Sequence, residues 1–325
     1  KNEKGADSPL VLDGGQGYGT SNNNFFFSGN GVCGTLDSSR GLTPYYQVNG
    51  EVHYGALEDG FRETLEMLAQ WYEEGLIYKD FINGDLMSGQ ALAGSGEAGM
   101  YTAFLTIVSF QDANTGGQAW PAYDPVHKEG DEIHFGLAHD LVEGASAGSC
   151  ITAACADVEL VARWVDYVYT EEGQLLANYG LEGEGFEYVD GVPQLTDLVL
   201  NNPDYTSNVA LNRYALNFGI GLMDWERTTL GYTDAQKAAL EVWTEGDTAY
   251  NYPTNVTMTA EENETFNRIY SDISTHVSEG VLSFITGSKP LNDAAWTEFT
   301  DGIRAMNIDE CTAIKQAALD RYLSR

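Results

Sequence analysis

The sequence predicts an α/β fold, and three features of its 325 residues point to this class. Short apolar runs typical of buried strands alternate with amphipathic stretches that have helical spacing. A strand followed directly by a helix recurs along the chain, which favours α/β over a β-sandwich or a helical bundle. The hydrophobic content of 43% is enough to build a core. The length fits one large domain or two ordinary ones.

Strands and hairpins are predicted at five places along the chain. Apolar runs predict buried strands over residues 10–12, 99–104 and 149–155. Hairpins are predicted to turn at Asn49-Gly50 and at Asp190-Gly191, because both pairs tolerate the positive φ angles of a type I′ turn.

Helices are predicted where apolar residues recur on one face after an N-capping residue. The clearest early helix is expected over residues 57–76, with glutamates on its exposed face. Asp157 and Thr170 are expected to cap two successive helices. Thr259 and Glu262 form a capping box that begins a helical C-terminal third.

The charge balance excludes several classes of partner. Lys and Arg number 16 against 49 Asp and Glu, a net charge of −33. Such a charge repels phosphate backbones and anionic lipid, so nucleic acid and a membrane surface are not expected partners. No run of about 18 apolar residues is present, so the sequence predicts no membrane-spanning helix.

The four cysteines are not expected to form a disulfide framework or a zinc site. Cys33, Cys150, Cys155 and Cys311 are few and lack C-x-x-C spacing, so we expect free or buried thiols.

Two glycine-rich segments match the residue pattern of a catalytic or cofactor motif but lack the sequence context that the motif needs. Gly144-Ala-Ser146-Ala-Gly148 fits the nucleophile elbow of α/β hydrolases, but a strand-like run follows it instead of a helix. The G-x-G-x-x-G match over residues 29–34 is followed by loop-like sequence rather than the helix that a dinucleotide site needs. We therefore expect no cofactor, no metal and no enzyme activity, and keep a hydrolase using Ser146 as the least favoured alternative.

Aromatic residues occur in loops among Gly, Asn and Asp. A sugar has an apolar C–H face ringed by hydroxyls, so its site needs aromatic platforms together with polar side chains. For any single one of these aromatic residues, packing in the core is favoured over contact with a ligand. The residues are Tyr18, Phe25, Phe26, Phe27, Trp120, Tyr123 and Trp225.

Several segments, in order, resemble a known family. They are WYEEGLIYKDF (71–81), SGEAGMY (95–101), YTEEGQLLANYGLEGEGFEYVDG (169–191), FITGSKPLND (284–293) and AALDRY (317–322). Together they resemble a family 1 extracellular solute-binding protein, and more narrowly the surface lipoproteins of Gram-positive bacteria that deliver sugars to ABC importers.

The resemblance implies a type II periplasmic-binding-protein fold, in which two α/β lobes close over a ligand. It implies that one lobe is largely missing from these residues and that an upstream segment carries a lipid-anchored cysteine. Residues 1–155 would be the first part of the second lobe, and 156–204 a returning segment of the first. Residues 205–325 would be the helical remainder, mostly second lobe. The implied location is extracellular, at the cell surface.

The resemblance also implies where a ligand binds. Tyr18, Asn24 and Phe25 lie in the stretch after the first strand, which reaches the cleft in maltose-binding relatives. Tyr101 and Phe104 stand where those relatives often carry a Gly-Pro-Trp-like platform, which is absent here, so a different or longer ligand is compatible.

Asp224 and Trp225 resemble an aromatic-acid pair near the hinge of such proteins.

The function implied is that of a monomeric, non-enzymatic receptor. It would bind a carbohydrate, most simply an oligosaccharide, in an interlobe cleft and hand it to the permease subunits of an ABC transporter. A peptide or another solute on the same fold is the main alternative, since the acidic balance suits a cationic peptide, and a surface adhesion module is a further one.

Overall fold

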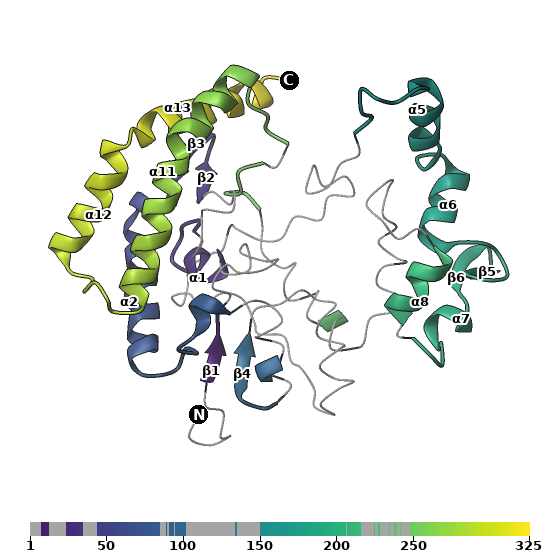
Figure 1. Cartoon of the computed structure of the whole chain (residues 1–325), viewed down its shortest axis with the longest axis horizontal. Coiled ribbons are helices and arrows are strands. Elements are labelled where there is room, and N and C mark those ends of the chain that lie inside the picture. Colours follow the sequence, from purple (N-terminus) through teal and green to yellow (C-terminus); the bar gives the residue numbers. More distant parts are fainter. Residues whose placement is uncertain are drawn as a thin grey trace. The chain divides into compact units, whose positions relative to one another are not determined.

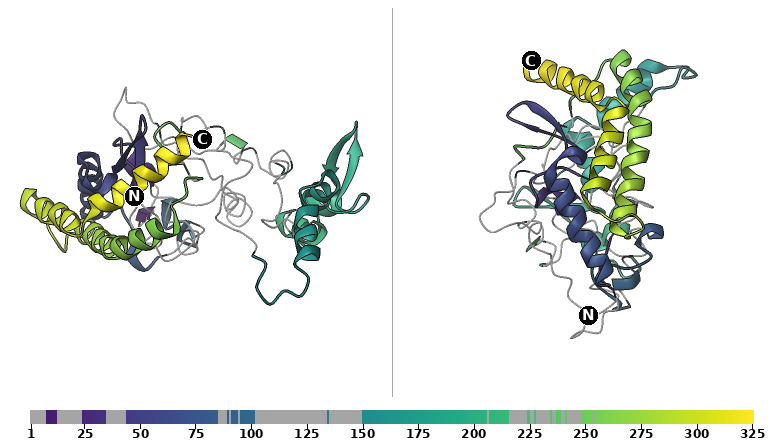
Figure 2. Two further views of the ribbon diagram at one scale, coloured as in Figure 1. Left: turned by 90° about the horizontal axis from the view of Figure 1, so that it is seen from above. Right: turned by 90° about the vertical axis from the view of Figure 1, so that its left-hand side faces the viewer.

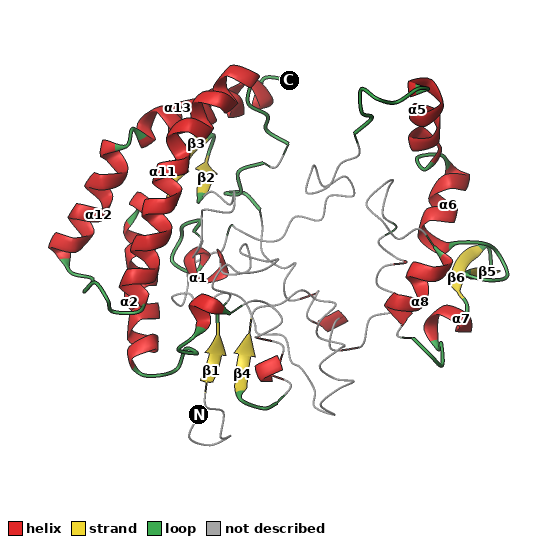
Figure 3. Cartoon of the chain, in the orientation of Figure 1, coloured by secondary structure: helices red, strands yellow, loops and turns green. Residues whose placement is uncertain are grey.

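The computed structural model divides the chain into two compact units (Figure 1). Unit 1 comprises residues 1–138 and 238–325, and unit 2 comprises residues 139–237. The residues that the structure describes are 8–12, 24–34, 44–84, 89, 91–93, 95–101, 134, 150–205, 207–215, 224, 227, 234, 237–238, 241, 248–253 and 255–325. Helices and strands both occur in each unit, as the colours of Figure 3 show, and the predicted α/β class is confirmed.

Unit 1 contains a parallel βαβ arrangement. Strand β1 (Ser8–Val11) pairs in parallel with β4 (Ala98–Tyr101), and Val11 lies opposite Tyr101. On its other side Leu10 pairs in parallel with Ile77. Helix α2 (Asp59–Glu73) lies between these pairing segments in sequence, which is the βαβ order. The strands predicted at 10–12 and at the start of 99–104 are confirmed, and residues 102–104 lie outside the described part.

The first predicted hairpin is confirmed and packs on the C-terminal helix. β2 (Tyr45–Val48) and β3 (Glu51–Tyr54) pair antiparallel, and Asn49 and Gly50 have φ angles of 53° and 89°. Two positive φ angles are what a type I′ turn requires. The Gln316 side chain accepts a hydrogen bond from Val52 N and donates one to Gly50 O, each 2.8 Å long. These bonds fix the hairpin to α13 (Ile308–Leu323).

Helix α2 buries its apolar face against the short helix α1 (Asn24–Ser28). Phe26 and Phe27 of α1 are fully buried, and the Phe27 ring stacks on Phe61 of α2 with centroids 4.7 Å apart. For these two loop aromatics, the core interpretation is confirmed.

Three C-terminal helices complete unit 1: α11 (Ala260–Ile285), α12 (Asp293–Ala305) and α13. Helix α11 contacts α2, α12 and α13, and the right-hand view of Figure 2 shows the blue α2 alongside the green α11 and the yellow-green α12. The stripe that α11 buries includes Phe266, Ile273 and Val277. Although α11 has 26 residues, no helix in the described part of the chain is long and apolar enough to cross a membrane.

The first two helices in the described part of unit 2 are both capped. The Asp157 carboxylate accepts a hydrogen bond from Leu160 N at the start of α5 (Val158–Tyr167), and Thr170 Oγ1 accepts one from Gly173 N in α6 (Glu171–Tyr179). Both predicted caps are therefore confirmed.

A hairpin and two further helices complete the described part of unit 2. They are β5 (Phe186–Val189), β6 (Val192–Leu195), α7 (Asp197–Leu200) and α8 (Ser207–Tyr214). Asp190 and Gly191 have φ angles of 52° and 81°, so the second predicted turn is also confirmed. A small core joins these elements, formed by Tyr179, Phe186, Leu195, Val199 and Leu211.

The strand predicted over residues 149–155 is wrong. Residues 150–155 form irregular backbone with a turn, in which Cys155 N donates to Thr152 O at 3.0 Å, and Cys150 and Ile151 are exposed. No strand in the described ranges pairs with this segment. A strand is stable only when a neighbour satisfies its backbone groups, and an apolar run by itself does not supply that neighbour.

All four cysteines are free thiols, as predicted. Burial raises the pKa of the Cys33 thiol to about 12 and that of Cys311 to about 11. Since the thiolate is the reactive form, these two side chains act as packing groups.

We predict that Glu262 contributes pH-dependent stability, because it joins the start of α11 to the end of α13. Its carboxylate accepts a hydrogen bond from Thr259 N at 2.8 Å and two from the Arg321 guanidinium, at 2.8 and 2.5 Å. Arg321 first, and then the Thr259 amide, lower the pKa of Glu262 below its usual 4.5. A lowered folded-state pKa contributes stability that is present above the unfolded-state pKa and is lost as the pH falls through the folded-state value.

Glu262→Gln should therefore lower the melting temperature at pH 7 by about 1–3 °C, the modest effect of an exposed ion pair. The difference from wild type should shrink toward pH 3. Glu261→Gln removes a neighbouring charge that lacks these bonds and serves as the control. If Glu262→Gln lowers the melting temperature by the same amount at pH 7 and at pH 3, Glu262 does not contribute pH-dependent stability.

Candidate ligand-binding site

In unit 1 the predicted site residue Tyr101 lies at the carboxyl end of a parallel strand. Because β1 and β4 are parallel, the ends at Val11 and Tyr101 share one edge of the sheet. In open α/β sheets, ligands bind outside the carboxyl ends of the strands. The half-buried Tyr101 ring lies beside Gly89, where an added Cβ would be 3.4 Å from the ring. Tyr101 thus stands at the edge where the fold rule expects a ligand.

The other predicted residues of unit 1 are described only in part. Asn24 and Phe25 begin α1, and their side chains lie outside the described part of the structure. Tyr18 and Phe104 lie outside the described residues altogether.

In unit 2 the predicted site residue Asp224 belongs to a hydrogen-bonded group at the end of α6. Its Oδ2 accepts a bond from the Tyr179 hydroxyl at 2.7 Å, and its Oδ1 accepts one from Arg227 N at 3.2 Å. Its own amide donates to Asn178 Oδ1 at 2.9 Å, and Arg227 Nη2 lies 3.4 Å from the same oxygen. Its predicted partner Trp225 lies outside the described residues.

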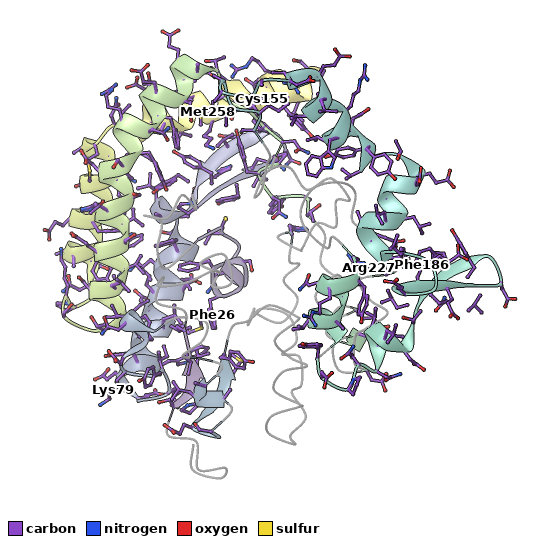
Figure 4. The ribbon with its side chains drawn as sticks, turned by 45° about the vertical axis from the view of Figure 1, so that its right-hand side comes forward. Phe26, Lys79, Cys155, Phe186, Arg227 and Met258 are labelled. Carbon is purple, nitrogen blue, oxygen red and sulfur yellow. The ribbon has the colours of Figure 1, made fainter. Side chains whose placement is uncertain are left out.

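This group is anchored because its members are packed on the unit 2 core. Tyr179, Asn178 and Arg227 are each about 95% buried, and the Tyr179 ring meets Phe186 edge-on at 5.8 Å. Figure 4 labels Arg227 and Phe186, which come from the same unit. Asp224 is only half-buried, so its carboxylate is held in one orientation while keeping access to solvent.

Gly180 explains why α6 ends where it does. Its φ angle is 84°, a left-handed conformation that glycine adopts at no steric cost. An added Cβ there would lie 1.8 Å from the carbonyl oxygen of Tyr214 in α8. Only glycine lets α6 end this close to α8, and this fixes Asn178 and Tyr179 in the last turn.

An open depression of about 930 Å³ surrounds the Asp224 group. Its lining combines tyrosine rings, carboxylates and neutral polar groups with a few aliphatic residues, and none of the lining residues is a lysine or an arginine. Every lining residue belongs to unit 2. They are Tyr167, Thr170, Glu171, Glu172, Gln174, Leu175, Asn178, Tyr179, Tyr188, Gly191, Pro193 and Asp224.

The depression is negatively charged because α6 begins with two glutamates. Acidic residues in the first turn of a helix are stabilised by its dipole, so Glu171 and Glu172 also have a purely structural role. Partial burial, and then the neighbouring Glu172 carboxylate, raise the pKa of Tyr167. Its hydroxyl therefore stays protonated and can donate a hydrogen bond at neutral pH.

The described side chains of this depression offer hydrogen-bonding groups and aromatic faces. Aromatic faces and hydrogen-bonding side chains suit a polyhydroxylated ligand. No group of three or more His, Cys, Asp or Glu residues within the described ranges is arranged to hold a metal ion. Ser146, the alternative nucleophile, lies outside those ranges. His276 is stacked on Phe299 and bonded to the Phe299 carbonyl at 3.0 Å, which is a packing role within α11 and α12.

The sequence analysis named Asp224 as a candidate but did not name the residues that hold it. Tyr179 and Asn178 lie about 45 positions earlier in the chain. The one local signal is the Tyr179-Gly180 pair, which predicts where α6 ends but not that Tyr179 reaches Asp224.

The chain has the fold of solute-binding proteins. No model of a known family matches the sequence. No curated protein matches it by sequence either. The likeness is therefore one of structure.

Three solved structures illustrate it. Alginate-binding protein AlgQ2, without calcium ion, matches with a TM-score of 0.75 at 20% identity, over 98% of this chain and 65% of its own. The S. pneumoniae ABC-transporter substrate-binding protein FusA, in complex with kestose, matches with a TM-score of 0.69 at 22% identity, over 99% and 65%. An HMO-binding, ABC-transporter-associated solute-binding protein from Bifidobacterium longum infantis matches with a TM-score of 0.64 at 16% identity, over 99% and 66%. The chain thus spans about two thirds of the length of these proteins.

We predict that the Tyr179 hydroxyl stabilises unit 2 through Asp224. Tyr179→Phe removes the donor and leaves a partly buried carboxylate oxygen without it, so the free energy of unfolding should fall by about 1 kcal/mol. Tyr188→Phe removes a hydroxyl from an exposed ring in the same depression and should change it by less than about 0.5 kcal/mol. Urea unfolding followed by far-ultraviolet circular dichroism measures both. Equal losses in the two variants would mean that the Tyr179–Asp224 bond contributes nothing specific.

Proposed function

We propose that the protein is the extracellular substrate-binding component of an ABC importer and that it binds a carbohydrate, most simply an oligosaccharide. The observation that carries the proposal is the structural match over 98–99% of the chain to proteins named for binding alginate, kestose and HMO. In this proposal the protein is a monomer and not an enzyme, and its partners are the ligand and the permease subunits. A lipid anchor upstream of Lys1 would hold it at the surface of a Gram-positive cell.

The proposed ligand site lies in a cleft between two lobes. Residues 1–155 and most of 205–325 would form the second lobe, and residues 156–204 would return to the first. Tyr18, Asn24, Phe25, Tyr101, Phe104, Asp224 and Trp225 are the proposed ligand-binding residues. Tyr101 supports this because it ends a parallel strand, and Asp224 supports it because a fixed and half-exposed carboxylate can accept bonds from sugar hydroxyls.

A cationic peptide is the second candidate ligand, and one observation favours it. Glu171, Glu172 and Asp224 line a depression without basic lining residues, on a chain with a net charge of −33. Opposite charges would attract such a peptide at low salt.

A thermal-shift comparison separates the two ligands, because only a ligand that binds the folded state raises the melting temperature. The probes are kestose, an alginate oligosaccharide and a trilysine peptide. The comparison uses the protein extended by the residues encoded upstream of Lys1, because both lobes are needed for the proposed site. We expect at least one carbohydrate to raise its melting temperature, since a ligand at 100 times its dissociation constant stabilises the folded state by about 2.7 kcal/mol. A rise with trilysine alone would overturn the carbohydrate proposal in favour of the peptide.

A second experiment tests whether residues 1–325 hold only part of the site. We expect calorimetry to give a micromolar or tighter dissociation constant for the protein extended by the residues encoded upstream of Lys1. The 325-residue chain should bind the same sugar weakly or not at all, since a ligand between two lobes loses half of its contacts when one is incomplete. Equal affinities would refute the idea that upstream residues supply half of the site.

A further inference from the structure

Two of the four cysteines of the chain are accessible, and they lie close together in the sequence. Cys150 is exposed and Cys155 is half-buried, and both precede α5 in unit 2, where Figure 4 labels Cys155. Cys311 lies in the unit 1 core and Cys33 packs against it, and burial raises the pKa of each of these thiols. A thiol reacts as the thiolate and needs access to its reaction partner. The reactive thiols of the chain are therefore Cys150 and Cys155.

The backbone between these two cysteines turns back instead of extending. On a strand, residues five positions apart point to opposite faces, and their Cα atoms are roughly 17 Å apart. Residues 150–155 form no strand, and Cys155 N donates a hydrogen bond to Thr152 O at 3.0 Å. Such a bond closes a β-turn, whose first and last Cα atoms are less than about 7 Å apart. The turn therefore brings Cys155 back toward Cys150 and removes the strand geometry that would keep their sulfur atoms apart.

Within the described part of the structure, little holds this segment in one arrangement. The bond at the turn is the one hydrogen bond that residues 150–155 make there. Ile151 is 40% exposed and belongs to neither hydrophobic core. A disulfide needs Cα atoms about 4.4–6.8 Å apart. A segment with one local bond and little burial reaches this separation at small cost, because no packed contact has to break.

We propose that Cys150 and Cys155 are a redox-active pair, which closes an internal disulfide when the protein meets an oxidant of the small-disulfide class. One thiolate attacks a sulfur atom of the oxidant R–S–S–R, releases one R–SH and leaves a mixed disulfide. The second thiolate attacks the protein sulfur of that bond and releases the other R–SH. The two cysteine thiols lose two protons and two electrons, and the oxidant is reduced to two thiols.

The test treats the folded 325-residue chain with oxidised glutathione and then labels the remaining thiols with N-ethylmaleimide in urea. We expect mass spectrometry to find the peptide that contains residues 150–155 unlabelled and lighter by two hydrogen atoms, and to find it labelled after reduction. Cys33 and Cys311 should be labelled without reduction. Label or glutathione on Cys150 and Cys155, or a disulfide between two chains, would overturn the proposal.

Cys150→Ser and Cys155→Ser are matched variants, because each removes one accessible thiol from outside the core and leaves the other. In each variant the second step of the exchange has no thiolate. We therefore expect the remaining cysteine to carry glutathione, which the wild type does not carry there. A remaining cysteine that stays unmodified in both variants would contradict the exchange reaction and overturn the proposal.

A second measurement tests the contribution of the turn. The equilibrium between the internal disulfide and glutathione gives the effective concentration of one thiol at the other. We expect this effective concentration to be at least about fivefold higher in the folded chain than in the chain unfolded in urea, because the turn reduces the entropy that closing the ring costs. The unfolded chain has the same sequence spacing and is the control. An equal or lower value in the folded chain would show that the fold does not favour the pair.

Discussion

Unit 1 depends on burial of one face of α11. This face includes Phe266, Ile273 and Val277, which belong to the last quarter of the chain. Helix α11 nevertheless packs on α2, which lies in the first quarter. The apolar side of α2 stays incomplete until α11 is in place. Unit 1 must therefore be assembled from two distant segments, residues 1–138 and 238–325, with unit 2 inserted between them. Contacts of such long sequence separation must overcome the loop-closure entropy before they stabilise anything.

Unit 2 differs from unit 1 in how its local hydrogen bonding compares with its apolar burial. Its core has five residues, and its turns, caps and helix ends are well satisfied by hydrogen bonds, but much of its apolar surface is exposed. Local structure is thus well defined where tertiary burial is small. The same unit holds the half-exposed Asp224 carboxylate in place, through a tyrosine that is itself part of the core.

Only some residues of the candidate site could be predicted from the sequence. Asp224 and Tyr101 could be named because the segments around them resemble those of solute-binding proteins. Asn178 and Tyr179 could not, because helical spacing gives only the face of α6 on which they lie. Their contact with Asp224 spans about 45 residues of sequence, and it is made at the end of α6, where Gly180 lies close to the Tyr214 carbonyl oxygen.

Local chemistry let the sequence determine most elements: both Asx-Gly turns, the caps at Asp157, Thr170 and Thr259, and the α/β order. Such features depend on a few neighbouring residues and on backbone preferences. Tertiary structure alone decided that residues 150–155 are not a strand and that the apolar side of α5 joins neither core. Those outcomes depend on which surfaces pack together. An apolar pattern indicates that a surface is buried, but it does not indicate which other surface buries it.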